Sequence, residues 1–225
     1  MTEVYRPMTS NDRRAREQAA VKDKILAAAR HLFVSEGYES VSMRRIAQAI
    51  DYTAPALYTH FKDKTELMAE LCRRDFGTLA EHFNKLAKVA DPVERIFRIG
   101  MSYIRFATDN PNHYRLMFLS THPADLPPEP EDLKRMNDPD QDAYAFLRHT
   151  VAEAIDAGQF LPEHKDSHLI AQVLWAGVHG VASLQITHGQ DPWITWRSLE
   201  RRSRTICETT LRGFLTPQAS AAFNP

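Results

Sequence analysis

Residues 51–64 read DYTAPALYTHFKDK, and this stretch predicts one short helix with two different sides. Leu57 and Phe61 are one helical turn apart, so their apolar side chains share a face. Thr53 is a suitable N-cap, and Pro55 falls in the first turn, where its missing N–H costs nothing. We therefore expect a helix whose apolar side is anchored and whose hydroxyl-bearing side stays exposed.

Two further helices are predicted directly before this stretch. Apolar side chains at helical spacing indicate a first helix from Ala19 to about Glu36, ended by Gly37. Ser42 caps a second helix, which stops before a tight turn at Asp51. A short second helix, a brief turn and a short third helix have the spacing of a helix-turn-helix. In that motif the third helix lies in the major groove of duplex DNA, about 12 Å wide.

The polar side chains of this predicted motif suit contacts with a duplex. Hydroxyl groups contact phosphate oxygens and base edges, and Ala or Pro carbons contact thymine methyl groups. Lysines and arginines at helix N-termini lie where an anion is already favoured. The predicted DNA-binding residues are Ser42, Arg44, Arg45, Thr53, Ala54, Pro55, Tyr58, Thr59, His60, Lys62 and Lys64. For the arginines and His60, a solvated protein surface is the alternative.

Residues 1–18 are polar and predict a flexible arm. Its Arg13, Arg14 and Arg16 are candidates for an adjacent minor groove, or for a disordered tail. The charge distribution agrees with an anionic partner. The formal net charge is −1, but residues 1–64 hold eleven Lys/Arg and eight Asp/Glu, a balance of +3, whereas the remainder holds seventeen and twenty-one, a balance of −4.

Length and composition predict a globular protein of one large domain or two smaller ones. The chain has 225 residues, of which 43% are hydrophobic and 25% charged. Its two cysteines have no metal-type spacing and no apolar leader stands at the N-terminus, so we expect a cytoplasmic protein. The apolar run 169–187 is about as long as a membrane span. Because polar residues interrupt it, we expect a buried or interface helix and no membrane partner.

The remaining chain shows helical spacing without strand-like alternation, so we expect an all-α fold of about nine helices. Residues 121–132, THPADLPPEPED, predict a loop without regular structure. We expect a DNA-binding domain over 1–64 and a regulatory domain over 65–225. Two further helices are predicted to start near Asp63 and at Asp91-Pro92. The remaining predicted helices cover residues 110–119, 138–157, 165–188 and 192–215.

The run ILAAARHLFVSEGYESVSMRRIAQAIDYTAPALYTHFKDKTEL resembles the DNA-binding domain of the tetracycline-repressor (TetR) family of bacterial transcription regulators. The matching residues are Phe33, Gly37-Tyr38, Ile46-Ala47 and the pattern Ala56-Leu57-Tyr58-x-His60-Phe61-x-x-Lys64. The resemblance implies that helix 53–60 reads the groove and that Tyr58, His60 and Lys64 hold phosphates. Asp51 departs from the family, which usually has Gly there. WAGVHG at 175–180 and FATDNPNHYRLMF resemble a subgroup with a Trp-His-Gly signature in its C-terminal domain.

The second half of the chain offers candidates for an effector site. Trp175 and His179 share one face of a predicted helix, and an aromatic and Met-rich set lies on two earlier helices. A packed core is the alternative for all of them. The predicted ligand-binding residues are Tyr103, Phe106, Tyr114, Met117, Phe118, Trp175 and His179. His164 and His168 have no third ligand placed by sequence, so we expect no metal, and no cofactor motif is present.

The sequence thus predicts a regulator and not an enzyme. One recognition helix reads few base pairs, so we expect a homodimer that places two of them about 34–36 Å apart on a palindromic operator. By resemblance, the dimer forms through the last two helices, and an unidentified small-molecule effector releases the repressor. A regulator without a ligand, including an activator, is one alternative. Another is a helical enzyme using His179 as a base, which requires a second polar group beside that imidazole. The expected apolar face of the final helix comprises Trp193, Trp196, Leu199, Ile206, Leu211, Phe214 and Leu215.

Overall fold

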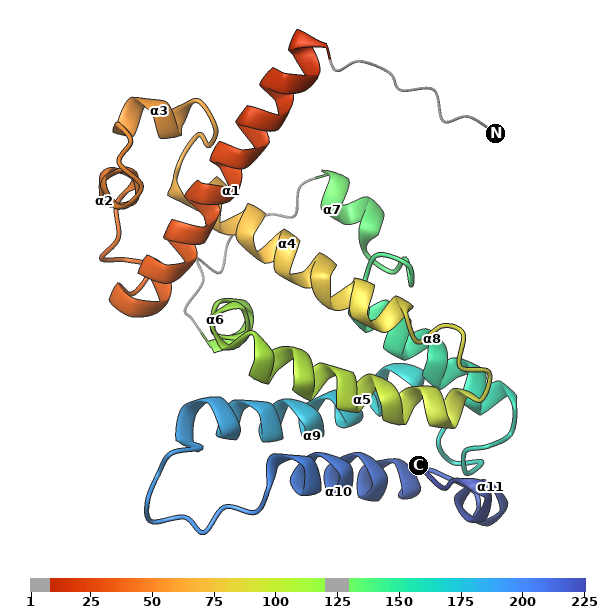
Figure 1. The fold of residues 1–225 in the computed structure, drawn as a ribbon. Helices are drawn as coiled ribbons and strands as arrows, with labels where there is room; N and C mark the ends of the chain where they lie inside the picture. Colours follow the sequence, from red (N-terminus) through yellow and green to blue (C-terminus); the bar gives the residue numbers. More distant parts are fainter. Residues whose placement is uncertain (1–8, 120–129) are drawn as a thin grey trace, which may run out of the picture. The chain divides into compact units, whose positions relative to one another are not determined.

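The computed structural model describes residues 9–119 and 130–225, and throughout that part the regular structure is helical (Figure 1). The predicted all-α fold is confirmed. The elements are α1 (Ser10–Glu36), α2 (Met43–Ala49), α3 (Ala54–Tyr58), α4 (Lys64–Asn84), α5 (Pro92–Asp109), α6 (Pro111–Tyr114), the π-helical η1 (Arg115–Leu119), α7 (Pro130–Arg135), α8 (Ala143–Asp156), α9 (Ser167–His188), α10 (Leu199–Arg212) and α11 (Pro217–Ala222).

The chain forms two compact units. The N-terminal unit comprises the described residues up to Cys72 together with η1. The C-terminal unit comprises Arg73–Tyr114 and the described residues from Pro130 onward. Helix α4 runs through the division at Cys72 and Arg73. The domain boundary after residue 64 remains a prediction.

Helix α1 begins earlier than expected. A flexible arm over 1–18 was predicted, but α1 starts at Ser10, so the prediction is wrong for 10–18, whereas 1–8 lie outside the described residues. The reason is a capping box that the sequence analysis overlooked. The Thr9 hydroxyl accepts a hydrogen bond from the backbone N–H of Asp12, and the Asp12 carboxylate accepts one from the backbone N–H of Thr9 at 2.9 Å.

The helix-turn-helix geometry forms as predicted. Ser42 caps α2 by accepting a hydrogen bond from the backbone N–H of Arg45 at 3.2 Å. Asp51, in the turn, adopts the left-handed conformation with φ of 59°. The predicted anchors of α3 are buried, with 0% of Leu57 and 2% of Phe61 exposed. Other members of the same core are Ile25, Ala29, Phe33, Ile46, Ala47, Leu67, Leu71 and Leu116.

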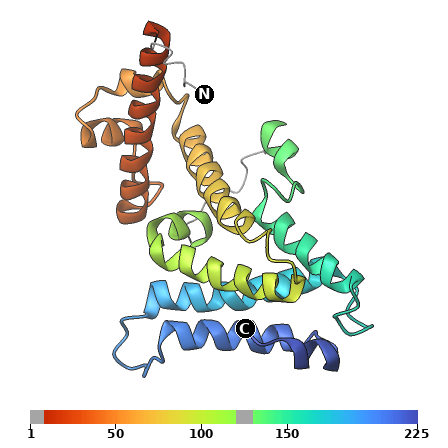
Figure 2. The same ribbon diagram turned by 45° about the vertical axis from the view of Figure 1, so that its right-hand side comes forward.

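In the C-terminal unit, α5 packs against α8, α9 and α10, and α9 also packs against α8 and α10. Figures 1 and 2 show α5, α9 and α10 stacked one above another. Helix α5 supplies the apolar centre because its Ile96, Phe97, Tyr103, Ile104 and Phe106 are all buried.

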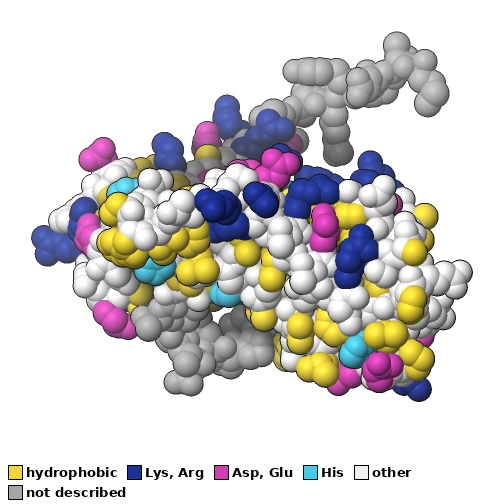
Figure 3. Space-filling view, turned by 90° about the horizontal axis from the view of Figure 1, so that it is seen from below, with side chains coloured by type: hydrophobic (Ala, Val, Ile, Leu, Met, Phe, Trp, Pro, Cys, Tyr) yellow, Lys and Arg dark blue, Asp and Glu magenta, His cyan; other side chains and the backbone are white. Residues whose placement is uncertain are grey.

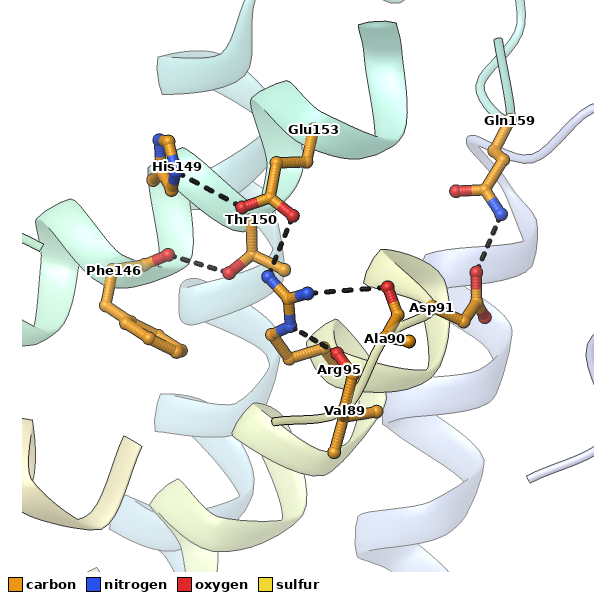
Figure 4. Close-up of polar contacts among 9 residues, drawn as sticks. All are labelled: Val89, Ala90, Asp91, Arg95, Phe146, His149, Thr150, Glu153 and Gln159. Carbon is orange, nitrogen blue, oxygen red and sulfur yellow. Dashed lines mark hydrogen bonds and ion pairs between the residues drawn. The ribbon is translucent and has the colours of Figure 1, made fainter. Parts of the chain in front are cut away.

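Arg95 ties three segments of the C-terminal unit together (Figure 4). Its side chain is buried on α5 and its Nε donates to the Val89 carbonyl at 2.8 Å, in the connection after α4. One terminal nitrogen donates to the Glu153 carboxylate of α8 at 2.8 Å, and the other donates to the Ala90 carbonyl at 3.4 Å. Glu153 is also paired with His149 at 3.2 Å. A buried guanidinium thereby keeps its donors satisfied.

Two expectations about the later helices are wrong. Helix α10 begins at Leu199 and not at 192, because Ser198 caps it by accepting the backbone N–H of Arg201. Trp193 and Trp196 therefore lie before the helix, and 78% of Trp193 is exposed. The predicted loop 121–132 ends inside α7, which begins at Pro130. Residues 121–129 of that loop lie outside the described part.

Helix α9 is long and apolar enough to cross a membrane by length and composition alone. In the structure it packs within the helices of the C-terminal unit, with Ile170, Ala171, Leu174, Val178 and Ala182 turned inward. Its outer side remains hydrophobic and exposed. Figure 3, seen from below, shows hydrophobic side chains exposed among Lys and Arg. The exposed apolar residues of α9 and the following loop are Leu169, Val173, Trp175, Leu184, Trp193 and Ile194.

Candidate functional site

The outer face of α3 is formed by the residues that the sequence predicts to touch DNA. Thr53, Pro55 and Tyr58 are exposed, and Tyr58 has 54% of its surface accessible. Thr53 occupies the N-cap position without making a side-chain capping hydrogen bond, so its hydroxyl group is not used by the helix end. Leu57 on the opposite side is fully buried. The short helix is thus held from behind and presents a phenol and a hydroxyl to solvent.

Other predicted DNA-binding residues already have partners within the N-terminal unit. The Thr59 hydroxyl donates to the Ala56 carbonyl at 2.7 Å. Arg45 pairs with Glu36 at 2.8 Å, whereas Arg44 beside it is exposed on the same helix. Both arginines lie on the surface of α2, so the surface remains basic. The structure places Ser42, Lys62 and Thr59 in exposed positions and Ala54 and His60 in half-buried ones.

Lys64 has a role that sequence reasoning missed. Its ammonium group donates to the Tyr38 carbonyl at 2.7 Å and lies 4.1 Å from the centroid of the Tyr38 ring. Tyr38 follows Gly37 after α1, and its ring contacts Phe33 at 5.2 Å between centroids. Lys64 thus fixes the connection between α1 and α2 to the start of α4. A contact between Lys64 and phosphate remains a prediction.

A polar cluster lies inside the C-terminal unit around His179 of α9. The Tyr103 hydroxyl of α5 lies 3.0 Å from His179 Nδ1, and the Tyr114 hydroxyl of α6 lies 2.9 Å from it. An unprotonated Nδ1 has one lone pair and accepts one of these protons at a time, whereas a protonated Nδ1 donates to one hydroxyl oxygen. The Tyr114 hydroxyl has a second acceptor, the carbonyl of His179 at 3.2 Å. Trp175 packs edge-on against the imidazole at 6.1 Å between centroids.

Burial sets the protonation states of this cluster. It lowers the pKa of His179, because the imidazolium form would lose hydration. It raises the pKa of Tyr114 to about 12, and the pKa of Tyr103 is raised further by burial and by its neighbour Tyr114. At neutral pH the cluster therefore contains two phenols and a neutral imidazole.

The structure brings together four of the seven predicted ligand-binding residues: Tyr103, Tyr114, Trp175 and His179. Phe106 is buried and contacts the ring of His82 of α4 at 5.7 Å. Met117 and Phe118 belong to η1 of the N-terminal unit. Among the described residues, no group of three or more His, Cys, Asp or Glu side chains has a metal-binding arrangement.

Comparison with known proteins identifies the family. Residues 25–71 match the model of bacterial regulatory proteins of the tetR family, and residues 96–201 match the model of the tetracyclin repressor-like C-terminal domain. The chain belongs to the TetR family. An HTH-type transcriptional regulator of Staphylococcus aureus (strain USA300) is 31% identical over 90 residues, which are 40% of this chain and 49% of that protein. The TetR chain therefore spans about half the length of the curated relatives it matches.

Solved structures extend the likeness in fold over nearly the whole chain. A protein of unknown function from Rhodococcus sp. RHA1 has a TM-score of 0.69 at 19% identity, covering 96% of this chain and all of its own. SmeT, the repressor of the multidrug efflux pump SmeDEF of Stenotrophomonas maltophilia, has a TM-score of 0.67 at 22% identity, covering 91% and 93%. Both share the TetR fold with this chain. The Trp-His-Gly subgroup remains a prediction.

Proposed function

We propose that this TetR-family protein is a DNA-binding transcriptional regulator, a repressor that binds a palindromic operator as a homodimer. The observation that carries the proposal is the exposure of Thr53, Pro55 and Tyr58 on a helix whose opposite side, at Leu57, is fully buried. A side chain that contacts base edges in a DNA groove must be exposed on the protein surface. The helix that carries it must be anchored firmly to the rest of its domain. Short helix α3 satisfies both conditions.

The contacts proposed for this face differ in kind. Tyr58 and Thr53 hydroxyls suit phosphate oxygens or base edges, whereas Ala54 and Pro55 offer carbon atoms to thymine methyl groups. Phosphate contacts fix the position of α3 and base-edge contacts supply specificity. The surrounding cations add attraction that does not depend on sequence. In this proposal they are Arg44, Arg45, Lys62 and Lys64.

The homodimer is proposed to form through α9 and α10. The exposed apolar side chains Leu169, Val173 and Leu184 recur along the outside of α9, and Trp193 and Ile194 follow in the connection to α10. A row of this kind is costly in water and is covered when two copies meet. A two-fold axis also supplies the second recognition helix that a palindrome requires.

A small-molecule effector is proposed to act through the C-terminal unit. Support comes from the match of this unit to the repressor-like C-terminal domain and from the polar cluster of Tyr103, Tyr114 and His179. SmeT, which shares this fold, is described as the repressor of a multidrug efflux pump. Coupling of about 1–3 kcal/mol between sites changes operator affinity by roughly 5- to 150-fold.

The two alternatives meet this geometry differently. Two phenols converge on His179, as the enzyme alternative requires, yet burial lowers the pKa of His179 and makes it a weaker base. Family membership also favours a regulator. The hydroxyl groups of Tyr103 and Tyr114 find acceptors within the protein, as expected for a regulator without a ligand. An effector would have to compete for those hydrogen bonds, so repression relieved by a ligand rests mainly on the family.

The deciding experiment first selects a DNA sequence that the protein binds and then tests binding after the Tyr58 side chain is removed. The protein is used to enrich 40-bp duplexes from a randomised pool, and the affinity for the enriched duplex is measured by fluorescence anisotropy. Tyr58→Ala should lose two charge-assisted contacts per dimer, about 3 kcal/mol or roughly 100-fold in affinity. Sedimentation of the same samples should give a dimer, alone and on the duplex.

Tyr144→Ala is the matched control, because it makes the same change on α8 of the C-terminal unit. Its affinity for the enriched duplex should stay within a few-fold of wild type. Failure to enrich any duplex, or equal affinity of the Tyr58→Ala and wild-type proteins, would contradict the DNA role of α3.

A further inference from the structure

The first turns of α1 form a helical extension whose residues are all exposed. We call residues Ser10–Gln18 the α1 extension. Every residue from Thr9 to Ala20 is exposed, and partial burial begins only at Val21 and Lys22. In Figures 1 and 2 this end of α1 projects past α3, which belongs to the same compact unit. About two and a half turns of helix are therefore built without any core to cover.

The extension is nevertheless specified as helix by its sequence. The capping box of Thr9 and Asp12 satisfies backbone groups at its start, and those hydrogen bonds lower the pKa of the Asp12 carboxyl group. Between Ser10 and Ala20 the residues are SNDRRAREQAA, rich in Ala, Arg, Glu and Gln, which favour helix. Because the extension continues a packed helix, it needs no separate nucleation. It is a defined arm and not a loose tail.

The two sides of the α1 extension differ in charge. At 3.6 residues per turn, Asn11, Arg14 and Gln18 fall in line with the face of α1 that is buried further along, at Ile25 and Ala29. That face carries no carboxylate within the extension. The acidic residues Asp12 and Glu17, together with Arg13 and Arg16, lie on the other sides. Among the described residues, no hydrogen bond or ion pair involves the Arg14 side chain.

The face of the α1 extension that carries Arg14 continues the side of α1 that packs near α3 and the start of α4. One turn beyond the extension, Lys22 lies 5.4 Å from the centroid of the Phe61 ring, which follows α3, and pairs with Glu70 of α4 at 3.0 Å. Arg14 precedes Lys22 by eight residues, about 12 Å along the helix axis. Along the axis of α1, the Cα atoms of Arg14 and Lys22 are therefore separated by about the width of a DNA major groove.

We propose that the α1 extension is a second DNA contact, in which Asn11, Arg14 and Gln18 bind the phosphate backbone flanking the base pairs that α3 reads. This inference rests on the proposed function. A polyanion fits because the face offers amide and guanidinium donors and no carboxylate. An apolar partner does not fit, since alanine is the only hydrophobic residue type in the extension. The contact adds affinity without adding sequence specificity.

The test compares two arginines of equal charge on different faces of the α1 extension. The full chain with Arg14→Ala or Arg13→Ala is titrated with the enriched 40-bp duplex and with a random 40-bp duplex, at 50–200 mM NaCl. Each lost phosphate contact lowers the slope of log affinity against log salt by about 0.9, so a dimer with Arg14→Ala should lose about 1.8. Over this fourfold salt range the affinity of Arg14→Ala should then fall about 12-fold less than that of wild type.

Arg14→Ala should also weaken binding to both duplexes roughly tenfold at 50 mM NaCl, since backbone contacts do not depend on sequence. Arg13→Ala should remain within about twofold of wild type, and circular dichroism should show both variants as helical as wild type. Equal salt slopes for the two variants would overturn the inference. If Tyr58→Ala still weakens binding in that case, only the α1 extension is refuted. If the wild type enriches no duplex, the proposed function itself fails.

Discussion

The two units of the molecule use their polar side chains in opposite ways. In the N-terminal unit, Tyr58 and Thr53 of the α3 region point to solvent, and the Thr59 hydroxyl beside them bonds only within its own turn, to the Ala56 carbonyl. In the C-terminal unit, polar side chains meet inside the fold across long stretches of chain. Tyr114 and His179 are 65 residues apart. The first arrangement leaves hydrogen-bond donors available for another molecule, whereas in the second the donors form hydrogen bonds within the folded chain.

This contrast separates binding from stability. Removing an exposed hydroxyl of α3 deprives a partner of a contact but leaves no buried group unsatisfied. Removing a member of an internal network leaves its former partners without hydrogen bonds in a place that water reaches poorly. Substitutions in the N-terminal unit should therefore change DNA affinity more than folding, and those in the C-terminal networks should do the reverse.

The largest expected loss of stability follows from Arg95→Ala in the C-terminal unit. The change leaves the carbonyls of Val89 and Ala90 and the carboxylate of Glu153 without the guanidinium group. Glu153 is partly exposed and recovers some hydration, so we expect a loss of about 2–3 kcal/mol in the free energy of unfolding. Urea denaturation followed by circular dichroism measures it.

Arg98→Ala is the control for Arg95→Ala, because Arg98 lies on the same helix and pairs with Glu94 at the surface. Such exposed pairs contribute less than about 1 kcal/mol. At temperatures where both variants are folded, DNA affinity should match wild type. Similar unfolding free energies for the two variants would remove Arg95 from the set of residues that hold this unit together.

The His179 cluster predicts a dependence of stability on pH. Burial lowers the pKa of His179 below its ordinary value of 6.5, so the unfolded chain takes up this proton first as pH falls. The contribution of His179 to the free energy of unfolding is thus complete above about pH 6.5 and declines as pH drops from there towards the folded-state pKa. His179→Asn keeps an acceptor near the position of Nδ1 but cannot be protonated in this range.

Unfolding free energies measured by urea at pH 7.5 and 5.5 test the role of His179. The wild type should lose more stability on acidification than His179→Asn. The control variant is His188→Asn, since His188 is exposed and pairs with Asp191. In this variant the part of the stability loss on acidification that comes from His179 should be as large as in the wild type. An identical pH response of wild type and His179→Asn would show that the imidazole of His179 titrates as freely in the folded protein as in the unfolded chain.

Much of the N-terminal unit could be predicted because its signals are local. The cap at Ser42, the proline in the first turn of α3 and the apolar anchors of that helix all lie within about twenty residues. Asp51 stands where the resemblance implies Gly, and its φ of 59° places it in the left-handed region that glycine adopts readily. The start of α1 was missed although the Thr9–Asp12 capping box was visible in the sequence. Its lack of an apolar stripe concealed it.

The candidate sites were predictable to different degrees for the same reason. The outer face of α3 follows from helical periodicity once Leu57 is taken as buried. The meeting of Tyr103 and Tyr114 with His179 depends on how α5, α6 and α9 pack, and no local pattern fixes that packing. The engagement of Lys64 with the Tyr38 carbonyl, across 26 residues, was hidden in the same way.

The smallest expected effect comes from two left-handed residues, one in each unit: Asp51, with φ of 59°, and Asn137, with φ of 67°. A Cβ atom is strained in this conformation, and alanine lacks the short polar side chain that eases it. Asp51→Ala and Asn137→Ala should each lower the free energy of unfolding by about 1 kcal/mol, whereas glycine at either position should change it by less. Only Asp51→Ala should also weaken binding to the enriched duplex, because that turn sets the direction of α3. Equal weakening of DNA binding by Asn137→Ala would contradict the comparison of the two units. Backbone strain in the C-terminal unit would then lower DNA affinity, and DNA binding would not depend on the N-terminal unit alone.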